Sequence, residues 1–292
     1  ALHRRLHTAF EISFALAVLV TLCMPNVFVW SPAGLLSPWP LLVQSADLIG
    51  EHDAARLNTP DWLWQAWTRA HGEETCRHIA ACHLCEAPLD ITVNGNAAEW
   101  AEKLNAEQLP TGTLRRVAGG RIEDLAGYAD GVWWIQDAAA ALPAHVLMAA
   151  FPEGIAGRCV ADLCAAPGGK TAQLAAGGAR VSAVDMSAAR IARLEDNLNR
   201  LGLDASLVVS DVATWRPDGL FDAVLLDAPC SGTGTIRRRP DIARLKSLAD
   251  VQRLARLQRQ LLDAASGLVA PGGVLVYAVC SLQPEEGEHQ VK

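Results

Sequence analysis

The chain has 292 residues, enough for roughly two domains that each bury a core. A hydrophobic content of 51% excludes an intrinsically disordered chain, and a formal net charge of −7 excludes a protein with a basic surface all round. Any contact with nucleic acid must therefore be confined to a local patch. The eight cysteines, several in apolar strand-like runs, favour reduced thiols over a disulfide framework, so we expect a cytoplasmic protein.

Residues 1–50 form a hydrophobic N-terminal segment whose role the pattern leaves open. The run at 12–30 carries no charged side chain and has about the length of a membrane span or a signal peptide's apolar region. Pro25 and Asn26 interrupt it, so we favour a buried helix. A membrane or signal segment and a non-native terminus are the alternatives, and we expect no membrane association.

Residues 51–130 predict a helical linker followed by a small α/β module. Thr59-Pro60-Asp61 predicts a helix with Pro60 at its first position, and residues 73–86 have the composition of a second helix. The elements expected of the module are a strand at 88–93, a helix at 97–105 and short strands at 114–117 and 122–125.

Five side chains of metal-ligating type lie close together in the second of these helices. They are Cys76, His78, Cys82, His83 and Cys85. One C-x-x-C among them is half of a zinc-binding spacing, but no second half follows. We therefore interpret them as small packing residues and expect no metal.

Residues 131–292 predict a larger α/β domain. Strand-like and helical runs alternate, which is typical of a doubly wound, mainly parallel, Rossmann-like sheet. The expected strands are 158–163, 180–185, 206–210, 221–227 and 273–280. One expected helix runs from Ser187 to Gly202, and another from 248 to 269 has Leu257 and Leu262 among its inward side chains. We expect Trp133 and Trp134 to lead into the first helix of this domain.

The stretch from Ala161 to Leu174, ADLCAAPGGKTAQL, organises the domain. It reads as a buried strand, a turn at Pro167-Gly168-Gly169 and a helix from Lys170. Glycine lets the backbone approach a ligand closely, and the unpaired N–H groups that open a helix can face an oxygen-bearing group. The stretch predicts a small-molecule cradle, although a purely structural turn has the same pattern.

Polar or reactive groups follow every strand of the expected sheet. After the glycine turn they are Asp185, Asp211, Asp227 with Cys230, and Cys280. The carboxyl ends of parallel strands share one rim, so we expect these groups close together. Asp185 follows the glycine turn at about the spacing at which a carboxylate binds ribose hydroxyls, whereas neither phosphate-binding glycine pattern is complete. The expected ligand is an adenosine cofactor without a pyrophosphate.

The two thiols indicate the reaction. Cys230 and Cys280 each precede a loop of small polar residues, a setting that can lower the pKa of a thiol. The alternative is a pair of buried structural cysteines. Spacing alone does not decide which thiol would be a nucleophile.

Four segments in order, DLCAAPGGKT, AVD, VLLDAPCSGTGTIRRRPDI and VYAVCSLQPEEGE, resemble the signature motifs of the Sun/Fmu-type (NOL/NOP/Sun) RNA (cytosine-5)-methyltransferases. The resemblance covers about residues 59–292. It implies an enzyme that uses S-adenosyl-L-methionine to methylate carbon 5 of a cytosine in RNA, with rRNA favoured over tRNA. We expect the small module to bind RNA and the protein to be a monomer.

The resemblance also implies a role for each motif residue. The cofactor would be lined by Cys164, Ala165, Ala166, Pro167, Gly168, Gly169 and Lys170. Asp185 would hold the ribose, Asp211 would lie by the adenine, and Asp227 would lie near the methionine end and the target base. Cys280 would be the nucleophile and Cys230 the thiol that helps to release the product.

The chemistry requires these parts as well. Carbon 5 of cytosine is a poor nucleophile until a thiolate adds to carbon 6, and Asp227 could act as a general acid at the ring. The base must leave its stack to be reached. Arg237, Arg238 and Arg239, next to the Cys230 loop, supply the local cationic patch that RNA phosphates need.

The sequence departs from the family pattern at two places. Val279 stands where the family commonly has Thr, and the chain stops twelve residues after Cys280, so we expect a truncated sheet. One alternative is an inactive RNA-binding remnant. Another is a methyltransferase that acts on an exocyclic amine, which Asp-Ala-Pro-Cys at 227–230 disfavours because such enzymes place an aromatic side chain there.

Overall fold

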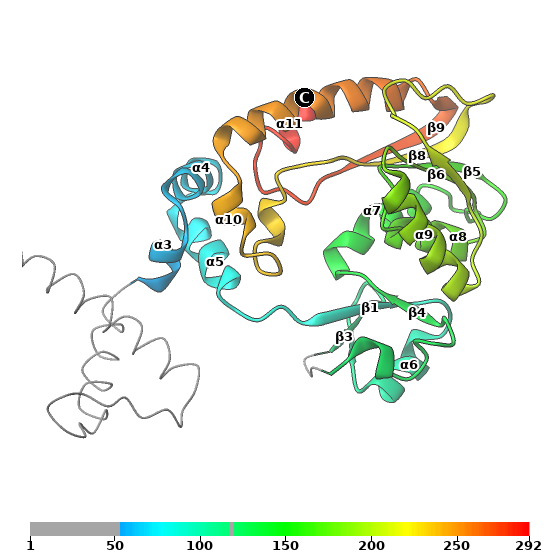
Figure 1. The fold of residues 1–292 in the computed structure, drawn as a ribbon, viewed down its shortest axis with the longest axis horizontal. Coiled ribbons are helices and arrows are strands. Elements are labelled where there is room, and N and C mark those ends of the chain that lie inside the picture. The colour runs from blue at the N-terminus through cyan, green and yellow to red at the C-terminus, as the bar shows by residue number, and fades with distance from the viewer. Residues whose placement is uncertain (1–52, 117–119, 292) are drawn as a thin grey trace, which may run out of the picture. The chain divides into compact units, whose positions relative to one another are not determined.

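The computed structural model describes residues 53–116 and 120–291, and the chain divides after Asn58 into two units. The described part of the first unit is one short helix, α3 (Ala54–Asn58). The apolar run at 12–30 lies outside the described residues. Among the residues that are described, no helix combines the length and apolar character needed to cross a bilayer. The second unit, residues 59–292, contains two sheets and every predicted site residue (Figure 1).

Two helices open the second unit, α4 (Asp61–His71) and α5 (Glu73–His83). Pro60 directly precedes α4 instead of occupying its first position. Cys76 is buried with Trp67 in one core cluster, whereas His78, Cys82 and Cys85 are exposed. Our interpretation of the cluster as packing residues is therefore wrong for these three. Within the described residues, no group of three His, Cys, Asp or Glu side chains could hold a metal ion.

A small antiparallel sheet follows, with the strand order β2-β3-β1-β4. Its elements are β1 (Leu89–Val93), α6 (Ala97–Leu104), β2 (Glu107–Gln108), β3 (Leu114–Arg116) and β4 (Trp133–Ile135). The strand expected at 122–125 is instead a 3-10 turn, because Ile122 and Leu125 are three positions apart and such a turn packs both against one core. β4 pairs with β1, so Trp133 and Trp134 belong to this sheet and our domain boundary at 131 cuts through it.

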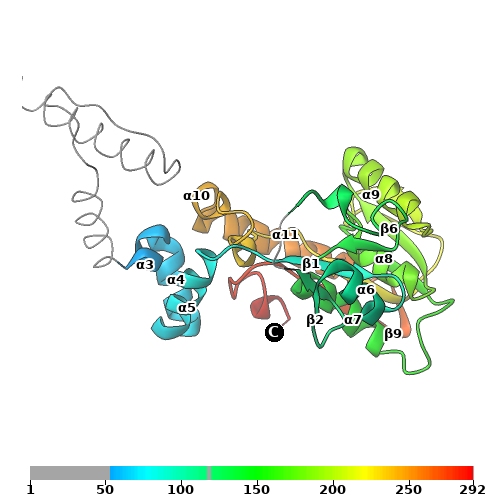
Figure 2. The same cartoon turned by 90° about the horizontal axis from the view of Figure 1, so that it is seen from below.

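The large sheet is parallel throughout, with the order β7-β6-β5-β8-β9, and it confirms the expected doubly wound Rossmann-like fold. Its strands are β5 (Cys159–Leu163), β6 (Arg180–Asp185), β7 (Ser206–Val209), β8 (Phe221–Asp227) and β9 (Val269–Ala278). The helices α7 (Ala138–Ala149), α8 (Gly169–Ala176) and α9 (Ala188–Leu201) cover one face, and α11 (Leu248–Ser266) covers the other (Figures 1 and 2). A short helix, α10 (Ile242–Leu245), precedes α11.

Two details of α11 differ from expectation. Leu257 is exposed and Gln258 is fully buried instead, because the inward stripe steps from Leu254 by four residues and then by three to Leu261. The helix ends at Ser266 instead of 269, and the Pro-Gly-Gly at 271–273 lies in the irregular first part of β9. Gln258 on α11 thus lies at the carboxyl end of the sheet, where its amide donates to the carbonyl of Pro229, just after β8.

Candidate active site

The glycine turn has the predicted strand–turn–helix form. Cys164 leaves β5 with φ 60°, and Gly168 precedes α8 with φ 101°, a left-handed conformation that glycine adopts readily. A Cβ at Gly168 would lie 2.7 Å from the Leu194 Cγ. No side chain caps the N-terminus of α8, so the first N–H groups of this helix remain available to a ligand.

A buried carboxyl group that sequence reasoning missed lies beneath the turn. Asp162 is completely buried in β5, and the Thr171 hydroxyl donates to it at 2.5 Å. Burial raises the pKa of Asp162 to about 7. Because Thr171 is on α8, this hydrogen bond ties the strand to the helix on either side of the turn.

Asp185 lies at the end of β6, beside the glycine turn. Its carboxylate accepts hydrogen bonds from the backbone N–H groups of Ala166, at 3.3 Å, and Ser187, at 3.0 Å. The Arg190 guanidinium lies 3.1 Å from the same carboxylate and also donates to the Ala166 carbonyl. A ribose bound here would share Asp185 with these donors, and Arg190 is a site residue that the sequence pattern did not reveal.

Asp211 follows β7 and is exposed. Its carboxylate accepts a hydrogen bond from the Ala213 backbone N–H at 2.9 Å, which is a local turn interaction. The hydrogen bonds described for Asp211 all lie within residues 210–215. These local contacts do not test the prediction that Asp211 lies by the adenine.

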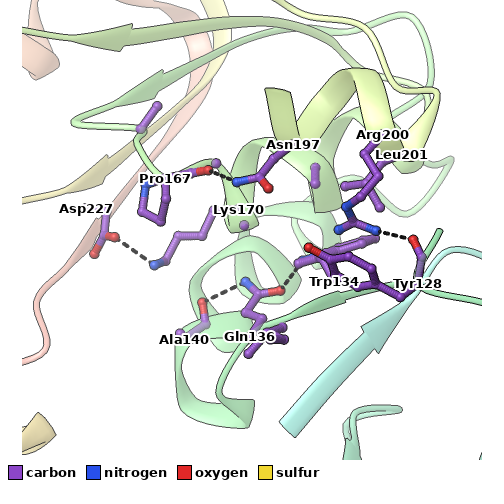
Figure 3. A pocket seen from close by; sticks show the side chains of 15 residues that line it. Tyr128, Trp134, Gln136, Ala140, Pro167, Lys170, Asn197, Arg200, Leu201 and Asp227 are labelled. Atoms are coloured by element: carbon purple, nitrogen blue, oxygen red, sulfur yellow. Dashed lines mark hydrogen bonds and ion pairs between the residues drawn. The ribbon is translucent and has the colours of Figure 1, made fainter. Parts of the chain in front are cut away.

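A pocket of about 300 Å³ opens beside the turn (Figure 3). Its lining includes Gly168, Gly169, Lys170, Asp227, Tyr128, Trp134, Gln136, Asn197 and Arg200. The Lys170 Nζ lies 2.7 Å from the Asp227 Oδ2, and the two side chains point toward one another in Figure 3. The ion pair joins the glycine turn to the end of β8.

The Gln136 amide also lines this pocket. It accepts a hydrogen bond from the Trp134 indole at 2.9 Å and donates to the Ala140 carbonyl at 3.3 Å and to the Gln173 amide at 2.6 Å. These contacts fix the segment between β4 and α7 against α8. Gln136 had no role in the sequence-based prediction.

The two thiols meet as predicted. The Sγ atoms of Cys230 and Cys280 lie 3.3 Å apart, because the adjacent strands β8 and β9 deliver their loops to the same place. A hydrogen bond from Cys230 lowers the pKa of the Cys280 thiol. The same contact, together with burial, raises the pKa of Cys230. Burial raises the pKa of Cys164, the third thiol at this rim, to about 12. Cys280 is therefore the thiol of the three that most readily becomes a thiolate.

The three consecutive arginines have different partners. Arg237 donates to the carbonyl of Cys85 at 3.2 Å and to that of Glu86 at 2.5 Å. Arg238 forms an ion pair with Asp137 and donates to the Pro88 carbonyl at 2.6 Å. Both guanidinium groups thus hold the segment that connects the helix pair to the small sheet.

Arg239 differs from its two neighbours because its side chain is 68% exposed. Its described ion-pair contact is with Asp241, at 4.0 Å, which is the limit for such a pair. Of the three arginines, Arg239 is the one with a guanidinium open to a phosphate.

Comparison with known proteins identifies a matching family and several relatives. Residues 154–292 match the profile of the family described as 16S rRNA methyltransferase RsmB/F. The ribosomal RNA small subunit methyltransferase B of Sodalis glossinidius is 40% identical over 267 residues, which cover 90% of this chain and 55% of that protein. The enzyme of the same name from Vibrio cholerae is 37% identical over 256 residues, covering 82% of this chain and 58% of the relative.

A solved structure has the same fold. The crystal structure of a methyltransferase homolog protein from Pyrococcus horikoshii is 30% identical, with a TM-score of 0.66, and the match covers 79% of this chain and 75% of that one. The chain spans little more than half the length of the curated relatives it matches. From its motifs, fold and relatives, the chain belongs to the RsmB/F, or Sun-type, family of RNA methyltransferases.

Proposed function

We propose that this chain transfers a methyl group from S-adenosyl-L-methionine to carbon 5 of a cytosine in RNA, and that the substrate is ribosomal RNA. The observation that carries the proposal is the pair of thiols 3.3 Å apart, of which Cys280 has the lowered pKa. A methyltransferase that acts on an amine has no use for such a pair, because a nitrogen lone pair attacks the methyl group without prior covalent activation.

The residues of the rim fit the methyl donor. The uncapped N–H groups of α8 suit a carboxylate, and the pocket beside the glycine turn has Asp227 at its edge. We propose that residues 164–170, Asp185, Asp211 and Asp227 hold the donor. S-adenosyl-L-methionine, when bound, supplies a methyl group on a positively charged sulfur that a carbon nucleophile can attack.

The chain's own residues prepare that carbon. The Cys280 thiolate forms a bond from Sγ to carbon 6 of the cytosine, and the electron pair of the 5,6 double bond moves toward the ring nitrogen and makes carbon 5 nucleophilic. After carbon 5 has been methylated, its proton passes to a water molecule, and the electron pair of that C–H bond re-forms the 5,6 double bond. The Sγ–carbon 6 bond breaks in the same step, and its electron pair returns to Cys280 as the thiolate. Cys230 lies beside Cys280 and is the thiol that we assign to this release step.

We propose that Asp227 assists the addition. It ends β8, pairs with Lys170 and lies beside Ala278 in the sheet, two positions before Cys280. We propose that its carboxyl group hydrogen-bonds or protonates the ring nitrogen as the adduct forms, while Lys170 fixes its orientation. We further propose that Arg239 and the small sheet contact the RNA.

The test is to find where a labelled methyl group goes. The full chain is incubated with methyl-labelled S-adenosyl-L-methionine and, separately, with 16S rRNA and tRNA transcripts, and the RNA is digested to nucleosides. We expect label in 5-methylcytidine from the rRNA. Label only in an amine-methylated nucleoside, or no label from either RNA, would overturn the proposal, and label from tRNA alone would overturn the substrate assignment.

A further inference from the structure

Glu286 is a buried carboxylate in the loop that follows the Cys280 strand. Its side chain is completely buried, and the described part of the chain places no Lys, Arg or His in an ion pair with it. Burying a carboxylate is costly unless several donors satisfy its oxygens. The contacts of Glu286 therefore account for its presence in the core.

Both carboxylate oxygens of Glu286 are fully used. The Oε1 accepts from the Ser231 backbone N–H at 2.8 Å and from the Gln258 side chain at 3.1 Å. The Oε2 accepts from the Ser281 hydroxyl at 2.6 Å and from the Ser231 hydroxyl. Four donors, from α11 and from both thiol loops, converge on one side chain.

These donors are the direct neighbours of the reactive thiols. Ser231 follows Cys230 and Ser281 follows Cys280, and the two serine hydroxyls lie 3.1 Å apart. Glu286 thus spans two loops that are about fifty residues apart in the sequence. Because charge-assisted hydrogen bonds are short and directional, this arrangement fixes the separation of the loops.

Further contacts brace the same cluster. The Tyr277 hydroxyl donates to the Glu286 backbone carbonyl at 2.6 Å, and Gln258 also donates to the Pro229 carbonyl at 2.9 Å. The Thr233 hydroxyl lies 3.2 Å from that of Ser281. The carboxylate is held from several directions and is not free to follow one loop away from the other.

We propose that Glu286 is a positioning residue that holds the Cys230 and Cys280 loops together so that both thiols reach one base. This inference rests on the proposed function, because that function supplies the RNA base that the two thiols would reach. The described hydrogen bonds of the Glu286 carboxylate go to Ser231, Gln258 and Ser281, and its charge is one of the causes that raise the pKa of Cys230. Glu286 takes no part in the bond changes, so its loss displaces the thiols without removing either one. Displacements of about 1 Å at a reacting group can cost on the order of 10²-fold in rate.

The test replaces Glu286 with Gln, which keeps the size of the side chain but converts one acceptor oxygen into a donor that faces other donors. The matched control is Glu285→Gln, one position away, where the buried Oε2 has no hydrogen-bond partner. The full chain is used throughout. Thermal unfolding shows whether each variant is folded, and Ser281→Ala, which removes one donor and leaves the carboxylate, is a milder second variant.

The first readout needs neither RNA nor methyl donor. The rate at which iodoacetamide alkylates Cys280 is measured against pH by mass spectrometry. We expect the midpoint to rise in Glu286→Gln, to rise less in Ser281→Ala and to stay in Glu285→Gln, because the Cys230 hydrogen bond that favours the Cys280 thiolate is lost when the loops separate. An unchanged midpoint in a folded Glu286→Gln protein would show that Glu286 does not set the thiol geometry.

The second readout is catalytic. We expect methyl transfer to RNA to fall about 10- to 100-fold in kcat for Glu286→Gln, with little change in KM for RNA. If the wild-type chain has no activity, the proposed function fails. The alkylation experiment still tests the positioning role of Glu286, because it needs no activity. A Glu286→Gln variant with wild-type kcat would overturn the positioning role.

Discussion

The glycine turn and the thiol pair lie on the same rim of the sheet, but the chain builds them differently. The turn is one continuous segment, residues 161–174, whose strand, turn and helix follow each other without interruption. The thiol pair joins two loops about fifty residues apart and depends on Glu286 and Gln258 to hold them. A local site is specified by its own residues, whereas an assembled site is specified by the residues that support it.

Asp227 is the point where the two halves meet. It forms the ion pair with Lys170 of the glycine turn and lies beside Ala278 in the strand that leads to Cys280. In our proposal the glycine turn holds the methyl donor and the thiols activate the base. The reaction therefore requires the turn and the thiol pair to be correctly positioned relative to each other. Substitutions on either side of Asp227 should therefore separate binding from chemistry.

The largest effect is expected at Asp227 itself. Asp227→Asn removes the carboxyl group that we propose assists the addition, and it replaces the Lys170 ion pair with a neutral contact. We expect the single-turnover rate of methyl transfer to fall roughly 10²- to 10⁴-fold. Asp218→Asn, in the exposed loop before β8, is the control. A rate for Asp227→Asn within a factor of three of the wild type would remove the general-acid role.

A change at the glycine turn should reduce stability and donor binding without touching the thiols. Gly168→Ala puts a Cβ at 2.7 Å from Leu194 and a non-glycine residue at φ 101°, which costs roughly 1–3 kcal/mol of unfolding free energy. Gly219→Ala, where no atom lies within 4 Å and φ is not left-handed, should be neutral. Urea unfolding and calorimetric titration of S-adenosyl-L-methionine measure both effects. Equal unfolding free energies for Gly168→Ala and Gly219→Ala would contradict the close contact between Gly168 and Leu194.

The thiols should differ in their pH dependence. The pKa of Cys280 is lowered, so its thiolate fraction near neutral pH exceeds that of an ordinary thiol, whose pKa is about 8.5. We expect iodoacetamide to alkylate Cys280 with a lower midpoint than that of an unperturbed cysteine. We expect Cys230→Ala to raise the midpoint, because the hydrogen-bond donor is gone. Faster alkylation of Cys230 than of Cys280 would reverse the assignment.

The smallest effect is expected among the arginines. Arg239→Ala should weaken RNA binding modestly and reduce the slope of log K against log salt by about 1, since one phosphate contact is lost. Arg237→Ala should instead lower the unfolding temperature, because Arg237 bonds to the carbonyls of Cys85 and Glu86. An identical loss of RNA affinity in both variants would contradict the separation of their roles.

The predictable part of this molecule is the part with a local pattern. Alternation of strand-like and helical runs predicted the parallel sheet, and the strand ends predicted that Cys230 and Cys280 meet. Periodicity failed where an element is very short. Residues 122–124 form a turn, and Trp133 and Trp134 pair with a strand some forty residues earlier.

The residues that support the site could hardly be recognised from the sequence pattern. Gln258 is the exception, because a polar side chain in the inward stripe of an otherwise apolar helix face is a signal for a buried hydrogen-bond network. Glu286, Arg190 and Asp162 have no such signal, since their partners lie in other segments and only the folded chain brings them together. The same limit applies to Arg237 and Arg238, whose partners are backbone carbonyls and Asp137.

The central claim is that Cys280 attacks the base and Cys230 releases it. The most direct measurement is to incubate the Cys280→Ala and Cys230→Ala chains with S-adenosyl-L-methionine and substrate RNA and to separate the products on a denaturing gel. We predict a covalent protein–RNA band that accumulates with Cys230→Ala and is absent with Cys280→Ala. A band with Cys280→Ala and none with Cys230→Ala would contradict it.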